Sequence, residues 1–516
     1  MRRPGVAEGL AGAVATAVWI AGVGGADAWR DEVATMAVSG RSADEILLLV
    51  HRVDAVLAPY YLLIHVVAPG DVVGARVVSV VALATATALL LPLCRRAGVP
   101  AAGPWAAAFL VVSPVAARWA QEARPAALAV LAATAATLAL TVALTGGRAR
   151  SWCWYALAVV VLAHVQLTAL LLLPAHAVTV RVFRRDLLLR WAGAATVAVL
   201  AATPLLLAGS RQRAAIAWIA RPEASRLEDL PYVMLGSAPI AAVVLAAVVL
   251  AAARHDARQP AGPLPGVVTV ALPWAAVPPA ALWLGGQVTP LYTERYLVFC
   301  LPAVALLAGR ALAGLRRRHA AAAVATVLLL ALPHQLAVRA DGGHQEDLGR
   351  LLAVLRAEGR PGDAVVFEQQ GTRLLAEAFP ATFEPLRDVT LGRTGAAAGN
   401  LGGTGPAEAC RTIPARLGGS ARVWVVAFHG KRPDPPAAIA LAAMRGFAEE
   451  RSWRGRPYTL SLLVRRAATG DAVTCPARPA GAVEGQVAAG RRRPPERGRG
   501  ARCTSRRTRR RRSAGS

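Results

Sequence analysis

Lysine is almost absent from this chain of 516 residues: Lys431 is the only one. Arginine therefore carries nearly all of the positive charge, and the formal net charge is +27. Together with the abundance of Ala, Gly, Pro and Val, this bias indicates a very GC-rich genome, such as that of an actinobacterium. Arginine richness alone is therefore weak evidence for any particular function.

Two kinds of metal or phosphate motif are also missing. The six cysteines form no CxxC pair, which argues against a thiolate zinc site. No Walker pattern occurs, so nothing predicts a phosphate-binding P-loop. Cys410 and Cys475 flank part of a predicted outer lobe and are candidates for a disulfide.

Long apolar runs are what the chain does have. It is 55% hydrophobic, and runs of about twenty apolar residues, separated by short arginine-bearing loops, are typical of a multi-pass helical membrane protein. The first run, 10–26, follows Arg2-Arg3 as the core of a signal peptide would. Later runs of the same kind favour an uncleaved first helix.

The runs predict about eleven transmembrane helices. They cover 10–26, 74–94, 100–116, 123–145, 152–163, 165–180, 189–208, 238–253, 267–284, 297–312 and 320–337. Arginine clusters mark every second boundary, and the positive-inside rule then places the N-terminus in the cytoplasm. The split at His164 is the weakest assignment, since one long helix there would reverse the topology downstream. The arginines at 181–185, 254–258 and 316–318 oppose that reversal.

This topology predicts three parts. Residues 1–340 form a transmembrane domain, whose first outward loop, 27–73, contains two amphipathic pieces expected to lie at the membrane interface, 43–51 and 56–67. Residues 341–475 form a small extracellular α/β lobe, with a helix at 345–358 and strands at 364–367, 422–428 and 458–464. Residues 476–516 form a disordered arginine-rich tail. The predicted fold class is thus an all-α polytopic membrane protein with an α/β lobe.

Acidic and arginine side chains gather in the outward loops. A carboxylate at the membrane surface can take a proton from an incoming hydroxyl, and arginines can hold a lipid-linked phosphate through forked hydrogen bonds. Sugar transfer from a polyprenyl phosphate needs both. The residues that provide them are Arg30, Asp31, Glu32, Asp54, Arg76, Glu122, Arg124, Glu294 and Arg295.

The same loops resemble those of a known class of enzyme. The matching stretches are Trp29-Arg30-Asp31-Glu32, residues 51–56 and 60–65, residues 120–125, residues 294–297 and residues 360–366. Over roughly residues 10–370 the chain resembles membrane glycosyltransferases of the GT-C type. Its nearest likeness is the protein O-mannosyltransferase and aminoarabinose-transferase superfamily, in its actinobacterial mannosyltransferase-like branch.

The resemblance implies a mechanism. Asp31 would act as base on the acceptor hydroxyl in one inverting displacement, with Glu32 orienting it. Arg124 and Arg295 would lie near the donor phosphate, and Arg76 could join them. Further substrate-binding candidates are Asp54, Glu122 and Tyr296.

The implied donor is a polyprenyl-phosphate sugar, most plausibly mannose or arabinose. The acceptor would be a protein, lipid or polysaccharide of the cell envelope, reached from the outer face of the plasma membrane. No cofactor and no nucleic-acid partner are expected. A divalent metal held by His51 and His65 with Asp54 or Glu32 is the less favoured alternative.

Two other functions are compatible with the same sequence features. A transporter or flippase for a lipid-linked saccharide would carry ionisable residues at mid-membrane depth, whereas here the charges gather at the outer boundary. A non-catalytic scaffold whose lobe binds cell-wall partners is a third possibility. For Asp31 and Glu32 themselves, the simplest alternative is a solvated loop beside a helix end, and for the arginines it is anchoring to lipid headgroups.

Overall fold

The computed structural model describes residues 5–253, 264–344 and 346–466, most of which are helical. Four features that the sequence singled out lie outside these residues: Arg2-Arg3, the arginines at 254–258, Cys475, and the arginine-rich tail. The Cys410–Cys475 disulfide therefore stays a prediction.

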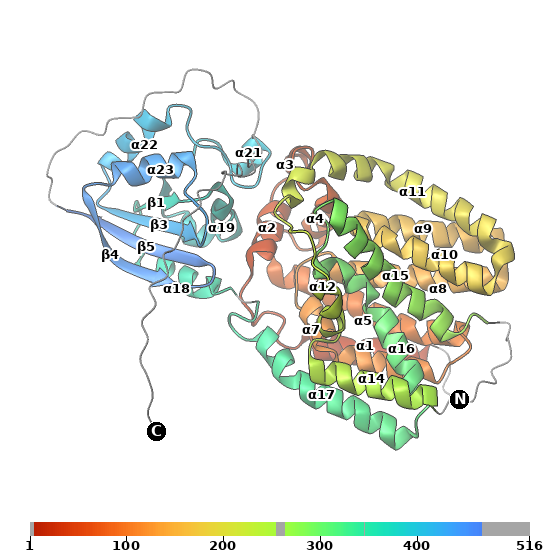
Figure 1. Ribbon diagram of the computed structural model, residues 1–516. Coiled ribbons are helices and arrows are strands. Elements are labelled where there is room, and N and C mark those ends of the chain that lie inside the picture. The colour runs from red at the N-terminus through yellow and green to blue at the C-terminus, as the bar shows by residue number, and fades with distance from the viewer. Residues whose placement is uncertain (1–4, 254–263, 345, 467–516) are drawn as a thin grey trace, which may run out of the picture. The chain divides into compact units, whose positions relative to one another are not determined.

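Every predicted apolar run overlaps a helix, although several bounds differ by a few residues (Figure 1). These helices are α1 (Val6–Ile20), α5 (Val72–Arg96), α6 (Ala102–Val112), α8 (Ala126–Gly146), α9 (Ala149–Val165), α10 (Leu172–Phe183), α11 (Leu188–Arg211), α14 (Ala238–Ala253), α15 (Val267–Val288), α16 (Leu301–Ala313) and α17 (Arg317–Arg339). The chain breaks between α9 and α10 beside His164, as predicted, and a 3-10 segment, η2 (Leu167–Leu171), occupies the break.

Within the described residues, six helical segments are long and apolar enough to cross a membrane. A seventh span arises if the segments 225–235 and 238–246, which meet at an angle of 82°, are counted as one. Helices α1, α6 and α9 and the segment 167–183 are shorter apolar helices. The chain is therefore a multi-pass membrane protein, and the count of eleven crossings stays a prediction.

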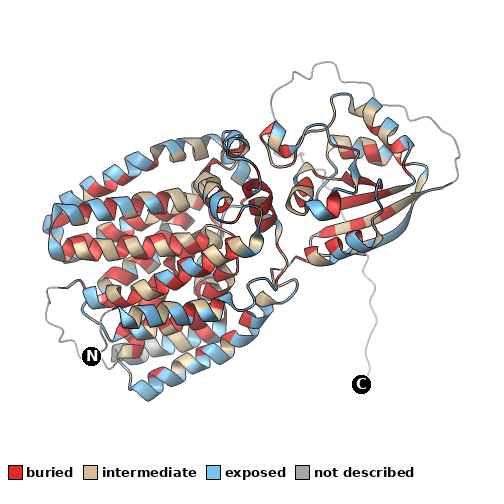
Figure 2. Ribbon diagram, turned by 180° about the vertical axis from the view of Figure 1, so that it is seen from behind, coloured by how far each residue is buried: buried red, intermediate tan, exposed pale blue. Residues whose placement is uncertain are grey.

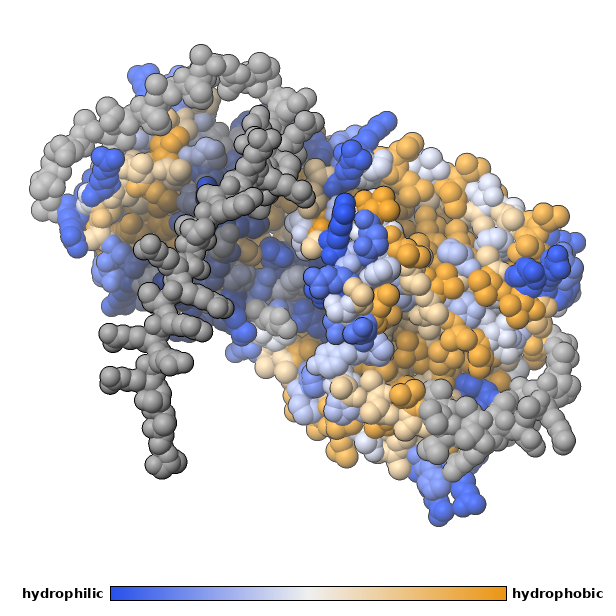
Figure 3. All heavy atoms as spheres, in the orientation of Figure 1, coloured by the Kyte–Doolittle hydropathy of each residue, from blue (hydrophilic) through white to orange (hydrophobic). Residues whose placement is uncertain are grey.

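The surface of the helical part is apolar where a bilayer would contact it. Figure 2 shows buried residues concentrated between the helices, and Figure 3 shows hydrophobic side chains over much of the helical surface. Leu189 on α11 is 87% exposed, and Leu329 and Leu336 on α17 are also well exposed. Side chains of this kind are stable in contact with lipid tails and unfavourable in water.

Small residues let the inner helices pack closely. A Cβ added to Gly309 on α16 would lie only 2.6 Å from the carbonyl oxygen of Ala102 at the start of α6. Close backbone approach at small residues is a common way for membrane helices to associate. The approach fixes α16, and hence the segment that leads into it from Glu294.

The segment 27–73, predicted to be the first outward loop, contains three helices. The two amphipathic pieces form α3 (Ala43–Val50) and α4 (Ala58–Val67), with η1 (Ala55–Leu57) before the latter, and their apolar faces meet in a small buried cluster. A third helix, α2 (Arg30–Ser39), was not predicted. It starts at the two acids that were expected to open a loop.

The C-terminal lobe is built on a five-stranded sheet of order β2-β1-β3-β5-β4. The three predicted strands are present as β1 (Ala364–Phe367), β3 (Arg422–Phe428) and β5 (Tyr458–Arg465), and the predicted helix is α18 (Leu348–Glu358). Strands β2 (Arg387–Asp388) and β4 (Phe447–Arg454) were missed. β1 runs parallel to β2 and β3, and β5 runs antiparallel to β3 and β4.

The remaining short helices connect these elements. They are α7 (Pro114–Ala120), η3 (Arg185–Leu187), η4 (Arg213–Ile216), α12 (Ser225–Glu228), α13 (Leu230–Leu235), η5 (Glu294–Cys300), η6 (Gln370–Arg373), α19 (Leu374–Ala378), α20 (Pro380–Phe383), α21 (Gly395–Ala398), α22 (Ala409–Gly418) and α23 (Pro435–Ala443). Helix α2 packs into the core of the lobe, where Val33 and Met36 are buried with Leu352 and Phe367. The position of Asp31 is therefore fixed from the transmembrane helices and from the lobe at once.

Candidate active site

The two adjacent acids lie in the first turn of α2. Trp29 has extended backbone angles at the N-cap, and its N–H donates to the Glu32 carboxylate over 3.4 Å. Negative charge is stabilised at a helix N-terminus by the helix dipole. Successive helical residues point about 100° apart, so the two carboxylates have different surroundings.

Glu32 points inward and is completely buried. Arg76 forms a bidentate salt bridge with its carboxylate, with distances of 2.9 and 2.7 Å. The Ala123 N–H also donates to the carboxylate over 2.7 Å, and His344 Nδ1 lies 3.2 Å from it. Burial raises the pKa of Glu32, but the hydrogen bonds from Arg76 and His344 outweigh this and lower it to about 2. The carboxylate is thus anionic and enclosed by protein donors.

Arg76 uses all five of its N–H groups within the protein. Besides the two bonds to Glu32, it donates to the carbonyl oxygens of Val23, Ala26 and Asp27. A guanidinium has five donors and no more. A donor phosphate could bind Arg76 only by displacing one of these bonds. Arg76 therefore has a structural role: it links α5 to α2 and to the segment that follows α1.

Asp31 points the other way, and its side chain remains 18% exposed. Its Oδ2 atom lies 2.8 Å from Arg295 Nη1 and 3.7 Å from Arg124 Nη2, while its Oδ1 atom lies 3.8 Å from Arg30 Nε. Arg124 also donates to the Asp31 backbone carbonyl over 3.3 Å. The structure therefore brings three predicted residues, Asp31, Arg124 and Arg295, into one accessible cluster.

Arg295 is held in place by aromatic rings. Its guanidinium lies 5.7 Å from the ring centroid of Trp218 and 5.7 Å from that of Tyr296. Contacts of this kind orient the guanidinium while leaving its donors free to bind anions. Tyr296, predicted to contact substrate, thus supports Arg295, and Trp218 is a supporting residue that the sequence motifs did not single out.

Asp54 adds a second carboxylate near Arg124. It adopts a left-handed backbone conformation with φ of 58°, and it accepts a hydrogen bond of 3.2 Å from the Tyr61 hydroxyl. Burial raises the pKa of Asp54, and the nearby positive charge of Arg124 offsets only part of that. The buried hydroxyl of Tyr60, also near Arg124, has no hydrogen-bond partner among the described residues.

Glu122 lies apart from this cluster. It is buried, its Oε1 atom pairs with Arg118 at 2.5 Å, and its Oε2 atom has no partner among the described residues. Burial raises the pKa of Glu122 to about 7, although the charge of Arg118 acts in the opposite direction. Its contact with Arg118 relates it to a neighbouring pocket rather than to Asp31.

The raised pKa of Glu122 predicts a pH effect on stability. The folded protein holds this proton up to a pH of about 7, whereas the unfolded chain releases it near 4.5, so stability is lost as the pH rises between these values. Glu122→Gln removes this titration. From pH 5 to pH 8 the variant should become increasingly more stable than the wild type, by up to about 3 kcal/mol in free energy of unfolding, which is seen as a growing difference in melting temperature. Plots of melting temperature against pH that run parallel for the two proteins would contradict the assignment.

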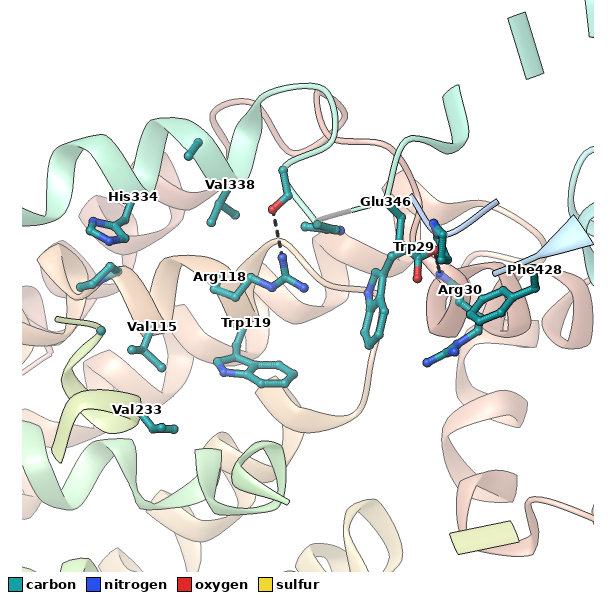
Figure 4. A pocket seen from close by; sticks show the side chains of 16 residues that line it. Trp29, Arg30, Val115, Arg118, Trp119, Val233, His334, Val338, Glu346 and Phe428 are labelled. Carbon is teal, nitrogen blue, oxygen red and sulfur yellow. Dashed lines mark hydrogen bonds between the residues drawn. The ribbon is translucent and has the colours of Figure 1, made fainter. Parts of the chain in front are cut away.

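A pocket of about 770 Å³ lies on the Arg30 side of α2 (Figure 4). Its polar lining includes Arg118, His344 and Glu346, and the Glu346 carboxylate accepts a hydrogen bond of 2.8 Å from the Arg30 N–H. Asp31 itself does not line it. His344 and Glu346 were not predicted as site residues, because they lie in the short segment after the last apolar run and carry no motif.

The two histidines considered as metal ligands have other partners. His51 Nδ1 lies 2.6 Å from the Leu47 carbonyl oxygen, and His65 Nδ1 lies 3.0 Å from that of Ser39. Across the described part of the chain, no three His, Cys, Asp or Glu side chains are grouped so that they could hold a metal ion.

Comparison with known proteins places this geometry in a known fold. No family model matches the sequence, and no curated protein matches it. ArnT from Cupriavidus metallidurans, solved bound to undecaprenyl phosphate and in the apo state, superposes with a TM-score of 0.56 at 14% identity; the match covers 88% of this chain and 97% of ArnT. The apo oligosaccharyltransferase of Archaeoglobus fulgidus matches with a TM-score of 0.47 at 11% identity, over 82% of this chain and 69% of its own. The similarity to ArnT confirms the fold that the loops suggested: this chain has the fold of the GT-C glycosyltransferases. The mannosyltransferase-like branch stays a prediction.

Proposed function

We propose that the protein is a membrane glycosyltransferase that transfers a sugar from a polyprenyl-phosphate donor to an acceptor outside the cell, with Asp31 as general base. The observation that carries the proposal is the contrast between the two acids. Asp31 is accessible and faces Arg124 and Arg295, whereas Glu32 is enclosed by Arg76, Ala123 and His344.

The proposed step is a single displacement at the anomeric carbon of the donor sugar. The acceptor hydroxyl gives its proton to the Asp31 carboxylate as its oxygen bonds to the anomeric carbon. The bond from that carbon to the phosphate oxygen breaks, and the polyprenyl phosphate leaves with the electron pair. The configuration at the anomeric carbon is inverted, and the proton on Asp31 is then released to solvent.

Arg124 and Arg295 provide the positive charge that the leaving phosphate needs. Both lie beside the Oδ2 atom of Asp31, so a phosphate bound between them would be close to the base. A bound phosphate would also compete with Asp31 for the Arg295 guanidinium, freeing the carboxylate as the donor arrives. The binding of donor would in this way prepare the base.

Two observations and one general premise support the choice of donor and of membrane side. ArnT, which shares the fold, was solved with undecaprenyl phosphate bound. The arginine-bearing loops at 95–96, 148–150 and 181–185 lie at the opposite ends of their spans from Asp31, as the positive-inside rule requires for a site on the outer face. Nucleotide sugars are confined to the cytoplasm, so a sugar used outside must come on a lipid. The mannose-like or arabinose-like identity of the sugar rests on the resemblance of the loops alone.

Arg295→Gln tests the phosphate role. The loss of a charge-assisted contact to the donor should lower kcat/KM for a polyprenyl-phosphate sugar about 10- to 100-fold, mainly through a higher donor KM. Transfer of radiolabelled sugar is measured in proteoliposomes that hold the purified protein. Arg221→Gln is the matched control, because Arg221 is exposed in the segment 209–237. Equal donor KM values for Arg295→Gln and the control would remove Arg295 from the donor site.

A further inference from the structure

The pocket beside Arg30 differs in character from one end to the other. Figure 4 shows Val115, Val233, His334 and Val338 toward one end, Trp29, Arg30, Glu346 and Phe428 toward the other, and Arg118 and Trp119 between them. The first end is formed by α7, α13 and the last turns of α17; the second lies at the start of α2. An apolar group suits the first end, and a polar headgroup suits the second.

The apolar end lies next to a helix that faces lipid. Helix α17 is mostly exposed along its length, and Leu329 and Leu336 present large apolar side chains at its surface. His334 and Ala337, which line the pocket, are themselves exposed. A hydrocarbon chain could therefore pass from the bilayer into this end of the pocket without crossing water.

The polar end contains hydrogen-bonding groups that lack partners. His344 is only 3% exposed, and its Nε2 atom has no hydrogen-bond partner within the described residues; the same holds for the buried Trp29 Nε1. Buried polar atoms without partners are rare in proteins. Hydroxyl groups on a ligand can donate to or accept from an imidazole nitrogen and can accept from an indole N–H.

Positive charge and aromatic faces complete this end. The Arg30 guanidinium lies 5.4 Å from the ring centroid of Phe428, and both residues line the pocket. Trp29 adds an indole ring at this end, and Trp119 adds another in the middle of the pocket (Figure 4). Aromatic faces of this kind can pack against the C–H surface of a sugar ring, while the hydroxyl groups of the sugar stay hydrated.

The pocket and the proposed phosphate site approach Asp31 from different sides. Arg30, which lines the pocket, lies near the Oδ1 atom, whereas Arg124 and Arg295 lie near Oδ2. An acceptor whose headgroup extends from the pocket past Arg30 would reach the Oδ1 side of the carboxylate, away from the two arginines proposed to hold the donor phosphate. In-line displacement needs the acceptor and the leaving phosphate on different sides of the anomeric carbon, and separate approaches to Asp31 are compatible with this.

We infer that this pocket is the acceptor site and that the acceptor is an amphiphile: a hydroxyl-bearing headgroup lies against Trp29, Arg30 and His344, and a hydrocarbon part lies between α7, α13 and α17. Naming the ligand as acceptor rests on the proposed function; the amphiphile site itself does not. A protein acceptor would have no use for the apolar end.

Binding is tested without reference to catalysis. The purified full-length protein in nanodiscs is photolabelled with an alkyl mannoside that carries a diazirine in its alkyl chain, and labelled peptides are mapped by mass spectrometry. Label should appear within 114–119 and 334–338, and excess unlabelled alkyl mannoside should suppress it. Label spread evenly over exposed helices such as α11 would overturn the inference. Label at these positions without any sugar transfer would instead leave the site standing and remove the proposed function.

Kinetics distinguish the acceptor from the lipid part of the donor. Val338→Trp fills the apolar end of the pocket, and Leu336→Trp, at an exposed position on the same helix, is the matched control. With the alkyl mannoside as acceptor, Val338→Trp should raise the acceptor KM at least 10-fold and leave the donor KM within 2-fold, and Leu336→Trp should change neither. A raised donor KM would assign the pocket to the polyprenyl chain. Unchanged values for both substrates, or transfer only to a soluble peptide, would reject an amphiphilic acceptor here.

Discussion

Asp31→Asn is expected to abolish sugar transfer while the protein still folds and inserts in the membrane. The amide cannot take the proton of the acceptor hydroxyl, and removal of a positioned general base typically costs about 10²- to 10⁴-fold in rate. The loss should appear in kcat with both KM values nearly unchanged. Asp31 is partly exposed, and of its arginine neighbours Arg30 is exposed, Arg295 is partly exposed and Arg124 is largely buried. The Asn side chain has the same shape and keeps an oxygen that can accept from Arg295, so the melting temperature should fall only modestly.

Asp44→Asn provides the control for this variant. Asp44 lies in the first turn of α3, in the same loop, and is exposed. It should transfer sugar at the wild-type rate. If Asp31→Asn retained more than a tenth of wild-type kcat, Asp31 would not be the base, and Asp54 would become the next candidate because it lies beside Arg124 and its pKa is raised by burial.

The second large effect concerns stability. Glu32→Ala leaves the Arg76 guanidinium buried without its carboxylate, and removing one partner of a buried ion pair typically costs about 3–5 kcal/mol. Ala123 and His344 lose an acceptor as well. The melting temperature of Glu32→Ala in detergent should therefore fall by many degrees, and transfer should be lost together with folded protein.

An exposed ion pair provides the comparison. Arg451 and Glu358 are 3.1 Å apart at the surface of the lobe, and Arg451→Gln should change the free energy of unfolding by less than about 1 kcal/mol.

Acid should destabilise the wild type by protonating the buried Glu32 carboxylate. Since the folded pKa of Glu32 is about 2 and its ordinary value is 4.5, its contribution is present above pH 4.5 and is lost as the pH falls toward 2. A Glu32→Ala protein as stable as the wild type would show that the pair is dispensable.

The helical framework was accessible from sequence because it depends on local composition. Long apolar runs identify membrane helices whatever they pack against, and the strands 364–367 and 422–428 were predicted with the bounds they have in the structure. Strand β4 was missed for the converse reason. Its residues include Glu449, Glu450 and Arg451, and they are mostly exposed, so only pairing with β5 makes this segment a strand.

The candidate site was accessible only in part. Motif resemblance brought Asp31, Arg124 and Arg295 together, but it treated Glu32 and Arg76 as members of the same site. Their burial depends on contacts with residues 44 and more than 300 positions away along the chain, and neighbouring sequence holds no sign of them. The helical start at Arg30, which directs the two acids to different surroundings, was missed as well.

His344 illustrates what sequence could not give. It follows the last apolar run as an isolated histidine between Gly343 and Gln345. Its significance arises only when the chain folds so that one ring nitrogen reaches Glu32 and the other lacks a partner in a pocket lining.

One measurement tests the central claim most directly. Wild-type protein and Asp31→Asn are reconstituted in proteoliposomes with a radiolabelled polyprenyl-phosphate mannose and an alkyl mannoside acceptor, and the products are separated to detect new glycosidic bonds. We predict a disaccharide product of inverted anomeric configuration from the wild type and none from Asp31→Asn. Movement of the labelled lipid across the bilayer without a new glycosidic bond, equal in both proteins, would contradict the account and identify a transporter on the same fold.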